Sequence, residues 1–330
     1  MTDPSLDVVA VGHALVDVLS ATTDEFIDAQ GLAKGGMALI DEDRATDLYG
    51  QMGPGTEMSG GSAANTAVGV TSFGGRAAFI GRVRDDELGR VFAHDIRAAD
   101  VRFDNAPAAD GAPTGRCLVL VSPDAERTMN TFLGAAAQLH PNDVAQDLVR
   151  SAAVTYLEGY LFDEPDAKAA FRLAANTAHD AGRRVALSLS DTFCVERHRA
   201  DFLALVEHDV DVLFANDAEA CALYETSTLD DALDAVVRQC EVAAVTRSAA
   251  GSVIVGREDR VEVPARPVDR VVDTTGAGDL FAAGFLVGFT RGEGLRRCGE
   301  LGSLAAAEVI SHFGARPERR LADLVASPPR

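Results

Sequence analysis

The sequence predicts an α/β protein, with a mostly parallel β-sheet flanked by helices and a small β-sheet beside it. Short apolar or β-branched runs, typical of buried parallel strands, alternate with segments of helical length. Residues 15–55 and 101–133 interrupt this alternation with strand-like segments and turn residues. Helices then cover both faces of the sheet, and ligands bind beyond the carboxyl ends of its strands.

The predicted elements follow one another in a regular order. Strands are expected at residues 7–12, 77–80, 154–157, 185–189, 212–214 and 242–246, with helices at 63–73, 87–99, 166–181 and 230–240. Residues 253–263 are β-rich, with a hairpin turn at 256–259. Residues 284–313 read as packed helices, and the apolar residues near 321–325 could dock the tail. The residues expected at the carboxyl ends of strands are Gly12, Asp191, Asn216 and Thr246.

The two interrupting stretches predict a lid. Residues 34–40 (KGGMALI) and 114–121 (TGRCLVLV) contain strand-like runs, and a turn follows at Pro123 and Asp124. We expect a small antiparallel sheet, with both segments inserted into one domain that spans residues 1–330. The alternative is that these stretches extend the edge of the main sheet.

Composition narrows the function classes. The chain has 330 residues, 47% of them hydrophobic, which is ample for a large core. A net charge of -21 disfavours nucleic acid and anionic membranes as partners, so a bound phosphate needs a locally positive site. Five scattered cysteines without a C-x-x-C pair argue against disulfides and structural zinc. The chain shows no signal-peptide pattern and no membrane-spanning run, so a cytoplasmic protein is expected.

The most informative motif is residues 273–279 (DTTGAGD), which lead directly into an apolar helical segment. Gly276 and Gly278 allow unusual backbone dihedrals and close approach of a ligand. A helix that begins there directs free N–H groups and the positive end of its dipole at an anion. Asp279 can take a proton from a hydroxyl, so the pattern indicates phosphoryl transfer with a general base. The alternative is an ordinary N-cap with a glycine turn.

A second glycine-rich turn, residues 59–67 (SGGSAANTA), also leads into a helix. Gly60 and Gly61 allow close backbone approach, and the Asn65 amide offers donors and acceptors that suit sugar hydroxyls. Asp17, soon after the first strand, can accept hydrogen bonds from two vicinal hydroxyls. The structural alternatives are a tight connection into a helix and an exposed loop acid.

These motifs make the chain resemble the ribokinase family of sugar and nucleoside kinases, also called PfkB-type carbohydrate kinases. The resemblance covers nearly the whole length. It is carried, in the order of the family, by residues 12–17 (GHALVD), 60–65 (GGSAAN), 80–89 (IGRVRDDELG), 216–219 (NDAE), 245–247 (VTR) and 273–279. It implies a ribokinase-like fold, in which a Rossmann-like domain carries a β-sheet lid. It also implies transfer of a phosphoryl group from ATP, with Mg²⁺, to a substrate hydroxyl.

The resemblance implies roles for individual residues. Asp279 is implied as the catalytic base, with the amides of Gly276, Ala277 and Gly278 as the anion hole. The positions implied to bind the sugar or ribose are Asp17, Gly60, Gly61 and Asn65. Asn216 and Glu219 match an N-x-x-E element that organises Mg²⁺ and phosphates largely through water, and their spacing places both on one helix face. The positions implied to meet ATP are Asn216, Thr246, Arg247, Gly251, Thr275 and Gly278.

Two features depart from the family pattern. Ser248 stands where many relatives have a glycine after Thr246, which puts the close approach of this loop to ATP in question. Asp273 and Thr275 match one half of the family's monovalent-cation site, whereas residues 311–316 diverge from the other half. K⁺ is therefore a candidate cofactor beside ATP and Mg²⁺, with Asp273 as its candidate ligand.

Within the family the chain is most similar to adenosine kinases, through the layout of residues 24–42 and 125–136. The expected acceptor is the 5′-hydroxyl of adenosine or another purine nucleoside, and the candidate surfaces for the base are Phe132, Tyr160, Phe162 and Phe193. One alternative is a kinase of fructose, ribose or 2-keto-3-deoxygluconate. The other is a catalytically inactive, nucleotide-binding regulator. The expected partners are a small-molecule substrate and at most a second copy of the chain, with no nucleic acid or membrane.

Overall fold

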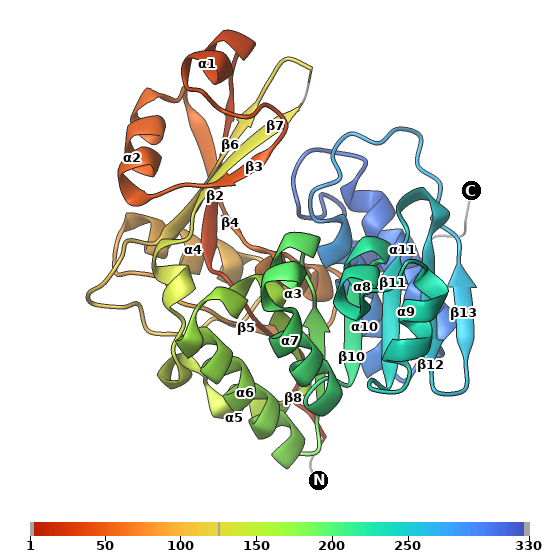
Figure 1. Ribbon diagram of the computed structural model, residues 1–330. Helices are drawn as coiled ribbons and strands as arrows, with labels where there is room; N and C mark the ends of the chain where they lie inside the picture. Colours follow the sequence, from red (N-terminus) through yellow and green to blue (C-terminus); the bar gives the residue numbers. More distant parts are fainter. Residues whose placement is uncertain (1–2, 125, 327–330) are drawn as a thin grey trace.

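Two sheets form the frame of the protein in the computed structural model, which describes residues 3–124 and 126–326 (Figure 1). Within these ranges the large sheet has eight strands in the order β13-β12-β11-β10-β9-β8-β1-β5. They are β1 (Leu6–Val11), β5 (Ala77–Ile80), β8 (Ala152–Glu158), β9 (Arg184–Ser188), β10 (Val212–Asn216), β11 (Val242–Thr246), β12 (Ser252–Gly256) and β13 (Arg260–Val263). The pairs from β5 to β11 are parallel, and β12 and β13 form the predicted antiparallel hairpin. The predicted parallel sheet is confirmed.

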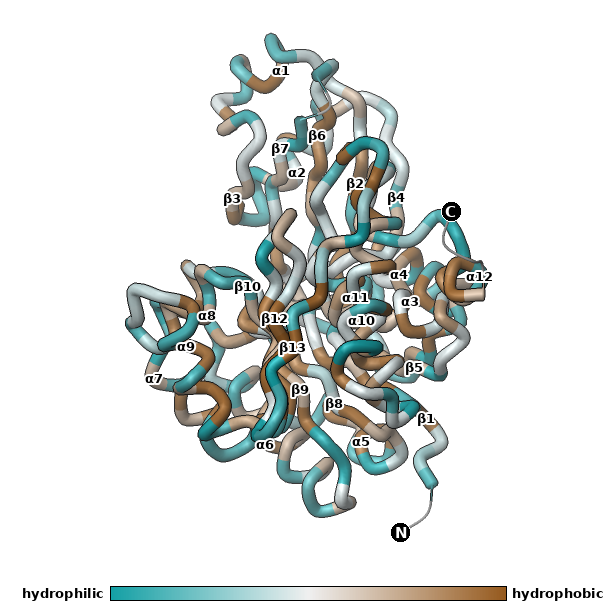
Figure 2. The backbone as a smooth tube through the Cα atoms, turned by 90° about the vertical axis from the view of Figure 1, so that its right-hand side faces the viewer, coloured by the Kyte–Doolittle hydropathy of each residue, from teal (hydrophilic) through white to brown (hydrophobic). Residues whose placement is uncertain are grey.

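Helices cover both faces of the large sheet because its strands are apolar on both sides. In β1, Val8 and Ala10 join one buried cluster, whereas Val9 and Val11 join the other. The first face carries α3 (Ser62–Ser72), α4 (Glu87–Ala98), α10 (Ala277–Thr290), α11 (Leu295–Val309) and α12 (Leu321–Ala326). The second carries α5 (Gln146–Ser151), α6 (Pro165–Asp180), α7 (Thr192–His208), α8 (Asp217–Tyr224) and α9 (Leu229–Val236). Figure 2 shows the hydrophobic positions gathered in the strands between these layers.

The small sheet stands at one end of the large one, where it forms the lid at the upper left of Figure 1. Its strand order is β3-β7-β6-β2-β4. The strands are β2 (Leu15–Ala21), β3 (Met37–Leu39), β4 (Gly55–Gly60), β6 (Gly115–Val121) and β7 (Arg127–Phe132), and the lid also carries α1 (Asp24–Ala29) and α2 (Glu42–Gln51). Residue Ala125, at the turn between β6 and β7, lies outside the described residues.

The prediction that the lid is antiparallel is wrong, because the sheet is mixed. β2 pairs with β6 and β3 with β7 in parallel, while β2–β4 and β6–β7 are antiparallel. β2 follows β1, and β6 follows residues 102–108, which run back along β5 in parallel after α4. Because β1 and β5 are parallel neighbours, the chain enters the lid twice in the same direction. Residues 101–114 stay with the main domain, where Arg102 forms a parallel bridge to Ala78 at the sheet edge.

Short 3₁₀ turns complete the frame at Gly134–Gln138, Pro141–Asp143, Gly159–Asp163 and Ser248–Ala250. The tail docks as expected, since Leu321 is buried and its N–H donates to Ser72 Oγ at the end of α3. Over residues 3–124 and 126–326, no helix is long and apolar enough to cross a membrane.

Candidate active site

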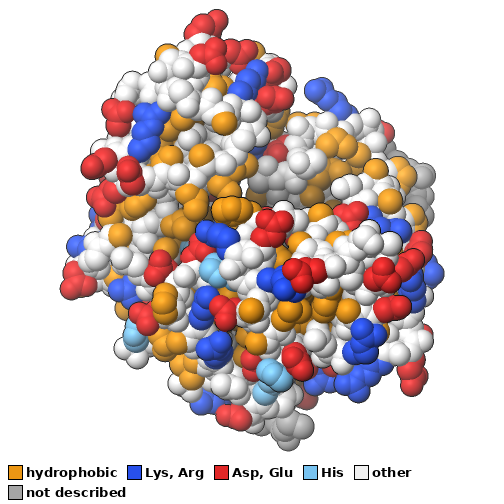
Figure 3. Space-filling view, in the orientation of Figure 1, with side chains coloured by type: hydrophobic (Ala, Val, Ile, Leu, Met, Phe, Trp, Pro, Cys, Tyr) orange, Lys and Arg blue, Asp and Glu red, His pale blue; other side chains and the backbone are white. Residues whose placement is uncertain are grey.

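One large cavity lies between the lid and the carboxyl ends of the parallel strands. Its volume is about 1430 Å³, larger than the roughly 300–1,000 Å³ typical of a site for one small ligand. Its walls include Asp17 from the lid, Asn65 from α3, Asn216 and Thr246 from the strand ends, and Asp279 from α10. Figure 3 shows the hollow between the lid and the main domain, with hydrophobic side chains gathered along it. The cavity therefore has room for two substrates side by side.

The predicted anion-binding turn begins α10. Gly276 adopts the left-handed conformation with φ 77°, and a Cβ there would lie 2.8 Å from Ala315, so the turn requires glycine. A Cβ at Gly278 would meet no atom within 4 Å, so this glycine leaves open space in front of the helix. The Ala277 N–H donates to the Thr274 carbonyl oxygen at 3.2 Å, so this member of the predicted anion hole already has a partner. Among the described residues, the Gly278 N–H is left without one.

Asp279 stands in the first turn of α10 against α3. Its carboxylate accepts hydrogen bonds from Ser62 Oγ at 2.6 Å and from Asn65 Nδ2 at 3.1 Å. Burial raises the pKa of Asp279 to about 6, and repulsion from Glu158 and Asp17 acts in the same direction, while the two hydrogen bonds lower it. A carboxylate with a pKa close to neutral is suited to accept a proton from a hydroxyl.

Asp17 reaches the same cavity from lid strand β2. Burial raises the pKa of Asp17 to about 6, against the opposing charges of Arg316 and Arg127. A Cβ on Gly60 would overlap the Asp17 carboxyl group, and Gly61 has φ 101° with no room beside the His13 carbonyl oxygen. Both predicted glycines are thus required by close packing, and Gly61 lines the cavity, whereas Gly60 makes room for Asp17.

A buried pair, His13 and Glu158, also lines the cavity and was not predicted. His13 Nδ1 lies 2.7 Å from Glu158 Oε1, and Glu158 Oε2 accepts the Ala63 N–H at 2.8 Å. The carboxylate therefore links the first connection of the lid to the start of α3. His13 and Glu158 are 145 residues apart, so no sequence pattern could have joined them.

Asn216 and Glu219 form a reciprocal capping box at the start of α8. Asn216 Oδ1 accepts the Glu219 N–H at 2.8 Å, and Glu219 Oε2 accepts the Asn216 N–H at 3.0 Å. Both line the cavity, and burial raises the pKa of Glu219 to about 7. Thr246 and Gly251 line this end as well. Arg247 is not among the lining residues, because its guanidinium pairs with Glu262 at 3.3 Å.

Asp273, the candidate cation ligand, is already engaged. Its carboxylate accepts the N–H groups of Thr275 at 3.0 Å and Gly314 at 2.9 Å, and pairs with Arg127 Nη1 at 3.0 Å. Arg127 comes from lid strand β7, lines the cavity and was not predicted as a site residue. Its Nε and Nη2 are buried and find no partner within the described part of the chain. The guanidinium thus supplies a positive charge where the resemblance implied K⁺.

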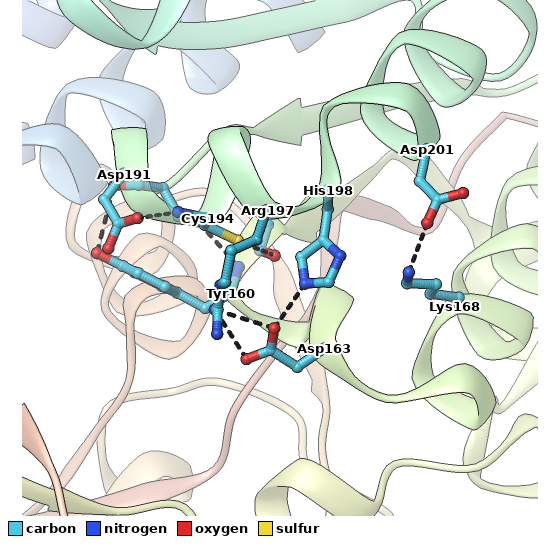
Figure 4. Close-up of polar contacts among 10 residues, drawn as sticks. Tyr160, Asp163, Lys168, Asp191, Cys194, Arg197, His198 and Asp201 are labelled. Carbon is cyan, nitrogen blue, oxygen red and sulfur yellow. Dashed lines mark hydrogen bonds and ion pairs between the residues drawn. The ribbon is translucent and has the colours of Figure 1, made fainter. Parts of the chain in front are cut away.

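Aromatic and charged side chains of the main domain also line the cavity, and Figure 4 shows the polar contacts around Asp163 and Arg197. The Phe193 side chain is 60% exposed, and the Arg197 guanidinium lies 4.4 Å from its ring centroid. Asp163 holds Arg197 at 2.9 Å and His198 Nε2 at 2.6 Å. Of the four aromatic candidates for the base, Tyr160 and Phe193 line this cavity. Phe162 instead stacks on Phe202 in the core, and Phe132 lines a separate, smaller cavity.

The donor set does not form a protein cage for a metal. In residues 3–124 and 126–326, no group of three or more His, Cys, Asp or Glu side chains is arranged to hold an ion. The cavity nevertheless has more lining carboxylates (Asp17, Glu158, Asp163, Asp191, Glu219 and Asp279) than arginines (Arg127, Arg197 and Arg266). A polyphosphate would need extra positive charge here, which a cation bound to the phosphates could supply.

Known proteins match this chain over nearly its whole length. Residues 8–320 match the pfkB family carbohydrate kinases. The crystal structure of adenosine kinase from Sinorhizobium meliloti is similar with a TM-score of 0.90 and 52% identity, covering 97% of this chain and 98% of that one. A probable sugar kinase from Rhizobium etli has a TM-score of 0.91 and 48% identity over 98% of both chains. Adenosine kinase from Saccharomyces cerevisiae is 29% identical over 95% of this chain and 96% of its own length.

The family match spans both the lid and the α/β domain, and it includes the cavity with Asp17, Asn65 and Asp279. The chain therefore belongs to the pfkB family of carbohydrate kinases, and it is a carbohydrate or nucleoside kinase with the ribokinase-like fold.

Proposed function

We propose that this kinase transfers the γ-phosphoryl group of ATP to the 5′-hydroxyl of adenosine or a closely related purine nucleoside. The observation that carries the proposal is a set of exposed apolar side chains along the cavity. Met37 and Leu39 of the lid are 51% and 53% exposed, and Phe193 of α7 in the main domain is 60% exposed. All three line the cavity.

Large apolar side chains that are exposed to water favour the binding of a ligand that covers them, because this removes their apolar surface from water. A purine offers two flat apolar faces to an aromatic ring and to aliphatic side chains, whereas a free sugar presents hydroxyls in all directions. The identity of 52% to a structure described as an adenosine kinase supports the same acceptor.

The acceptor site would combine groups from both parts of the protein. Asp17 comes from lid strand β2 and Asn65 from core helix α3. Both can bond ribose hydroxyls, which would leave the 5′-hydroxyl toward Asp279. Closure of the lid over this acceptor would exclude water from the phosphoryl donor and so limit hydrolysis.

In the proposed chemistry, Asp279 withdraws the hydroxyl proton as the oxygen attacks the γ-phosphorus in line with the leaving group. The start of α10, where Gly278 lines the cavity, stabilises negative charge on the transferring group. Kinases of this family use ATP with Mg²⁺, and a bound Mg²⁺ near Glu219 would neutralise part of the phosphate charge. The residues proposed to surround the nucleotide are Asn216, Glu219, Thr246, Gly251 and Thr275.

The experiment is Mg²⁺-dependent release of ADP from ATP, measured with adenosine, other nucleosides, ribose, fructose and 2-keto-3-deoxygluconate in parallel. We expect turnover with adenosine to exceed turnover with every sugar. Preferred turnover of a sugar would overturn the acceptor while keeping the mechanism. Binding of ATP without turnover on any acceptor would favour the regulatory alternative.

A further inference from the structure

We infer that Arg316 is a positioning residue, which holds the Asn65 amide in a fixed orientation against the Asp279 carboxylate. This inference rests on the proposed function, because it gives Asp279 the role of base. Arg316 lies in the loop after α11, next to Ala315, which packs on Gly276 at the start of α10. Arg316 is not among the residues that line the cavity, so it acts on the reaction through Asn65.

Two polar contacts run in series from Arg316 to the base. Arg316 Nε donates to Asn65 Oδ1 at 3.3 Å, and Asn65 Nδ2 donates to Asp279 Oδ2 at 3.1 Å. A guanidinium can only donate and a carboxylate can only accept. The two neighbours therefore impose the same orientation on the amide, with its oxygen toward Arg316 and its nitrogen toward Asp279.

Arg316 is itself anchored by Asp95 of α4. Its Nη1 lies 3.1 Å from Asp95 Oδ2, which also accepts the Ser59 N–H at 2.8 Å and Ser59 Oγ at 2.5 Å. Ser59 lies at the end of lid strand β4. The Arg316 side chain is only 14% exposed, and a charge so buried is retained at a cost unless it is paired. The pair with Asp95 thus fixes the guanidinium fork that faces Asn65.

The arrangement limits what Asn65 can offer a substrate. The amide has two N–H donors, and one of them is used by Asp279. One donor remains, so a substrate hydroxyl at Asn65 is expected to accept a hydrogen bond there and to donate its own proton to a carboxylate. The fixed amide also keeps one N–H donor on the Asp279 carboxylate, and this hydrogen bond favours the ionised form of Asp279.

A pH profile can report this effect because the groups around Asp279 are known. They are Ser62 and Asn65 from α3, Asp17 from β2, Glu158 and Tyr156 from β8, and Tyr160 from the turn that follows β8. Asp17 also faces the positive charge of Arg316, so the loss of that charge could act through Asp17 instead. Arg316→Lys keeps the positive charge that acts on Asp17 but lacks the planar fork that orients Asn65. This variant therefore separates the effect of charge from the effect of orientation.

The test compares Arg316→Lys, Arg316→Met and Asp95→Asn with the control Arg291→Met. Arg291 donates to the Phe73 carbonyl oxygen at 3.1 Å, at the opposite end of α3 from the base. We expect kcat to fall about 10- to 100-fold in both Arg316 variants, as for a misplaced catalytic group. The acidic limb of the kcat profile should move to higher pH, with the KM for ATP unchanged. Asp95→Asn should show a smaller change in the same direction, and Arg291→Met should keep the wild-type kcat and limb.

Wild-type kcat and pH profile in Arg316→Lys would overturn the inference. So would a loss of kcat with an unmoved acidic limb, because a merely structural role lowers the amount of folded enzyme without changing the base. If the Arg316 variants fail to fold, Asp95→Asn decides, and an unmoved limb there overturns the inference. Asp279→Asn is measured alongside. Wild-type turnover by Asp279→Asn would refute the assignment of Asp279 as the base. An inactive Asp279→Asn together with wild-type behaviour of Arg316→Lys would refute only the positioning role of Arg316.

Discussion

Replacement of Asp279 by asparagine tests both the chemistry and the electrostatics of the site. Asparagine preserves the size of the side chain, and its oxygen can still accept from Asn65 Nδ2. Its nitrogen can donate to Ser62 Oγ, so no buried polar group loses its partner. Because the variant lacks a general base, we expect kcat to fall about 10²- to 10⁴-fold. The KM for ATP should stay near the wild-type value.

The same variant is expected to be more stable than the wild type at pH 7. Burial raises the pKa of Asp279 from 3.8 to about 6. At about 1.4 kcal/mol for each pKa unit, ionisation of this carboxyl destabilises the folded state by at most about 3 kcal/mol. This destabilisation is full above pH 6, shrinks as the pH falls and is absent below pH ~4, where the carboxyl is protonated in both states. Asparagine is neutral throughout, so its advantage should follow the same course.

The assay is ADP release, combined with urea unfolding at pH 7 and pH 5. Asp201→Asn is the control, because the Asp201 side chain is only half-buried and its pKa is lowered by the hydrogen bond from Lys168. The same chemical change should therefore leave turnover intact there and make the protein slightly less stable. Wild-type turnover by Asp279→Asn would refute the base. A stability difference from wild type that does not change between the two pH values would refute the electrostatic reasoning.

Three further outcomes are expected. Asp17→Ala should raise the KM for the acceptor about 10- to 100-fold, as expected for lost charge-assisted hydrogen bonds, with the KM for ATP unchanged; an unchanged acceptor KM removes Asp17 from the site. Gly276→Ala should lower the melting temperature, because φ is 77° and a Cβ would lie 2.8 Å from Ala315. Gly278→Ala should keep the melting temperature, because a Cβ there meets no atom within 4 Å, and should raise the KM for ATP. A larger loss of melting temperature in Gly278→Ala than in Gly276→Ala contradicts the assignment. The pH profile of kcat/KM should fall below pH ~6, since the pKa values of Asp17 and Asp279 are both raised to about 6 and both carboxylates must be ionised; a profile flat to pH 5 contradicts this.

The sequence predicted those parts of the structure that depend on neighbouring residues. The strand at residues 242–246 matches β11 and the helix at 87–99 matches α4 to within one residue, because apolar period and cap residues act locally. The 17-residue helix α7 was not predicted, since its apolar face is weak and it is kinked at His198. The mixed lid was also missed, because strand direction depends on where the chain enters the lid.

The site was predictable where one short segment carries the chemistry. The turn with Gly276, Gly278 and Asp279 is such a segment, although its roles remain predictions. Partners that meet only after folding were missed, as the contact between Arg316 and Asn65 illustrates, since these residues are 251 positions apart in the sequence. Arg127 lies in a segment that the sequence connects only with the layout of adenosine kinases. Its pairing with Asp273 follows from the position of β7 in the lid.

The shortness of the lid connections has a mechanical consequence. Only residues 12–14 separate β1 from β2, and only Gly61 separates β4 from α3. These two links also carry His13 and Gly61, which line the cavity. A rigid-body swing of the lid must therefore involve the bonds of these two links, which also shape the proposed acceptor site. Opening the lid would separate the residues of that site. An acceptor bound to both Asp17 and Asn65 would therefore hold the lid and the main domain together. If Asp17 and Asn65 bind the acceptor as proposed, acceptor binding and lid closure are coupled, and the acceptor would determine when the donor phosphate is enclosed.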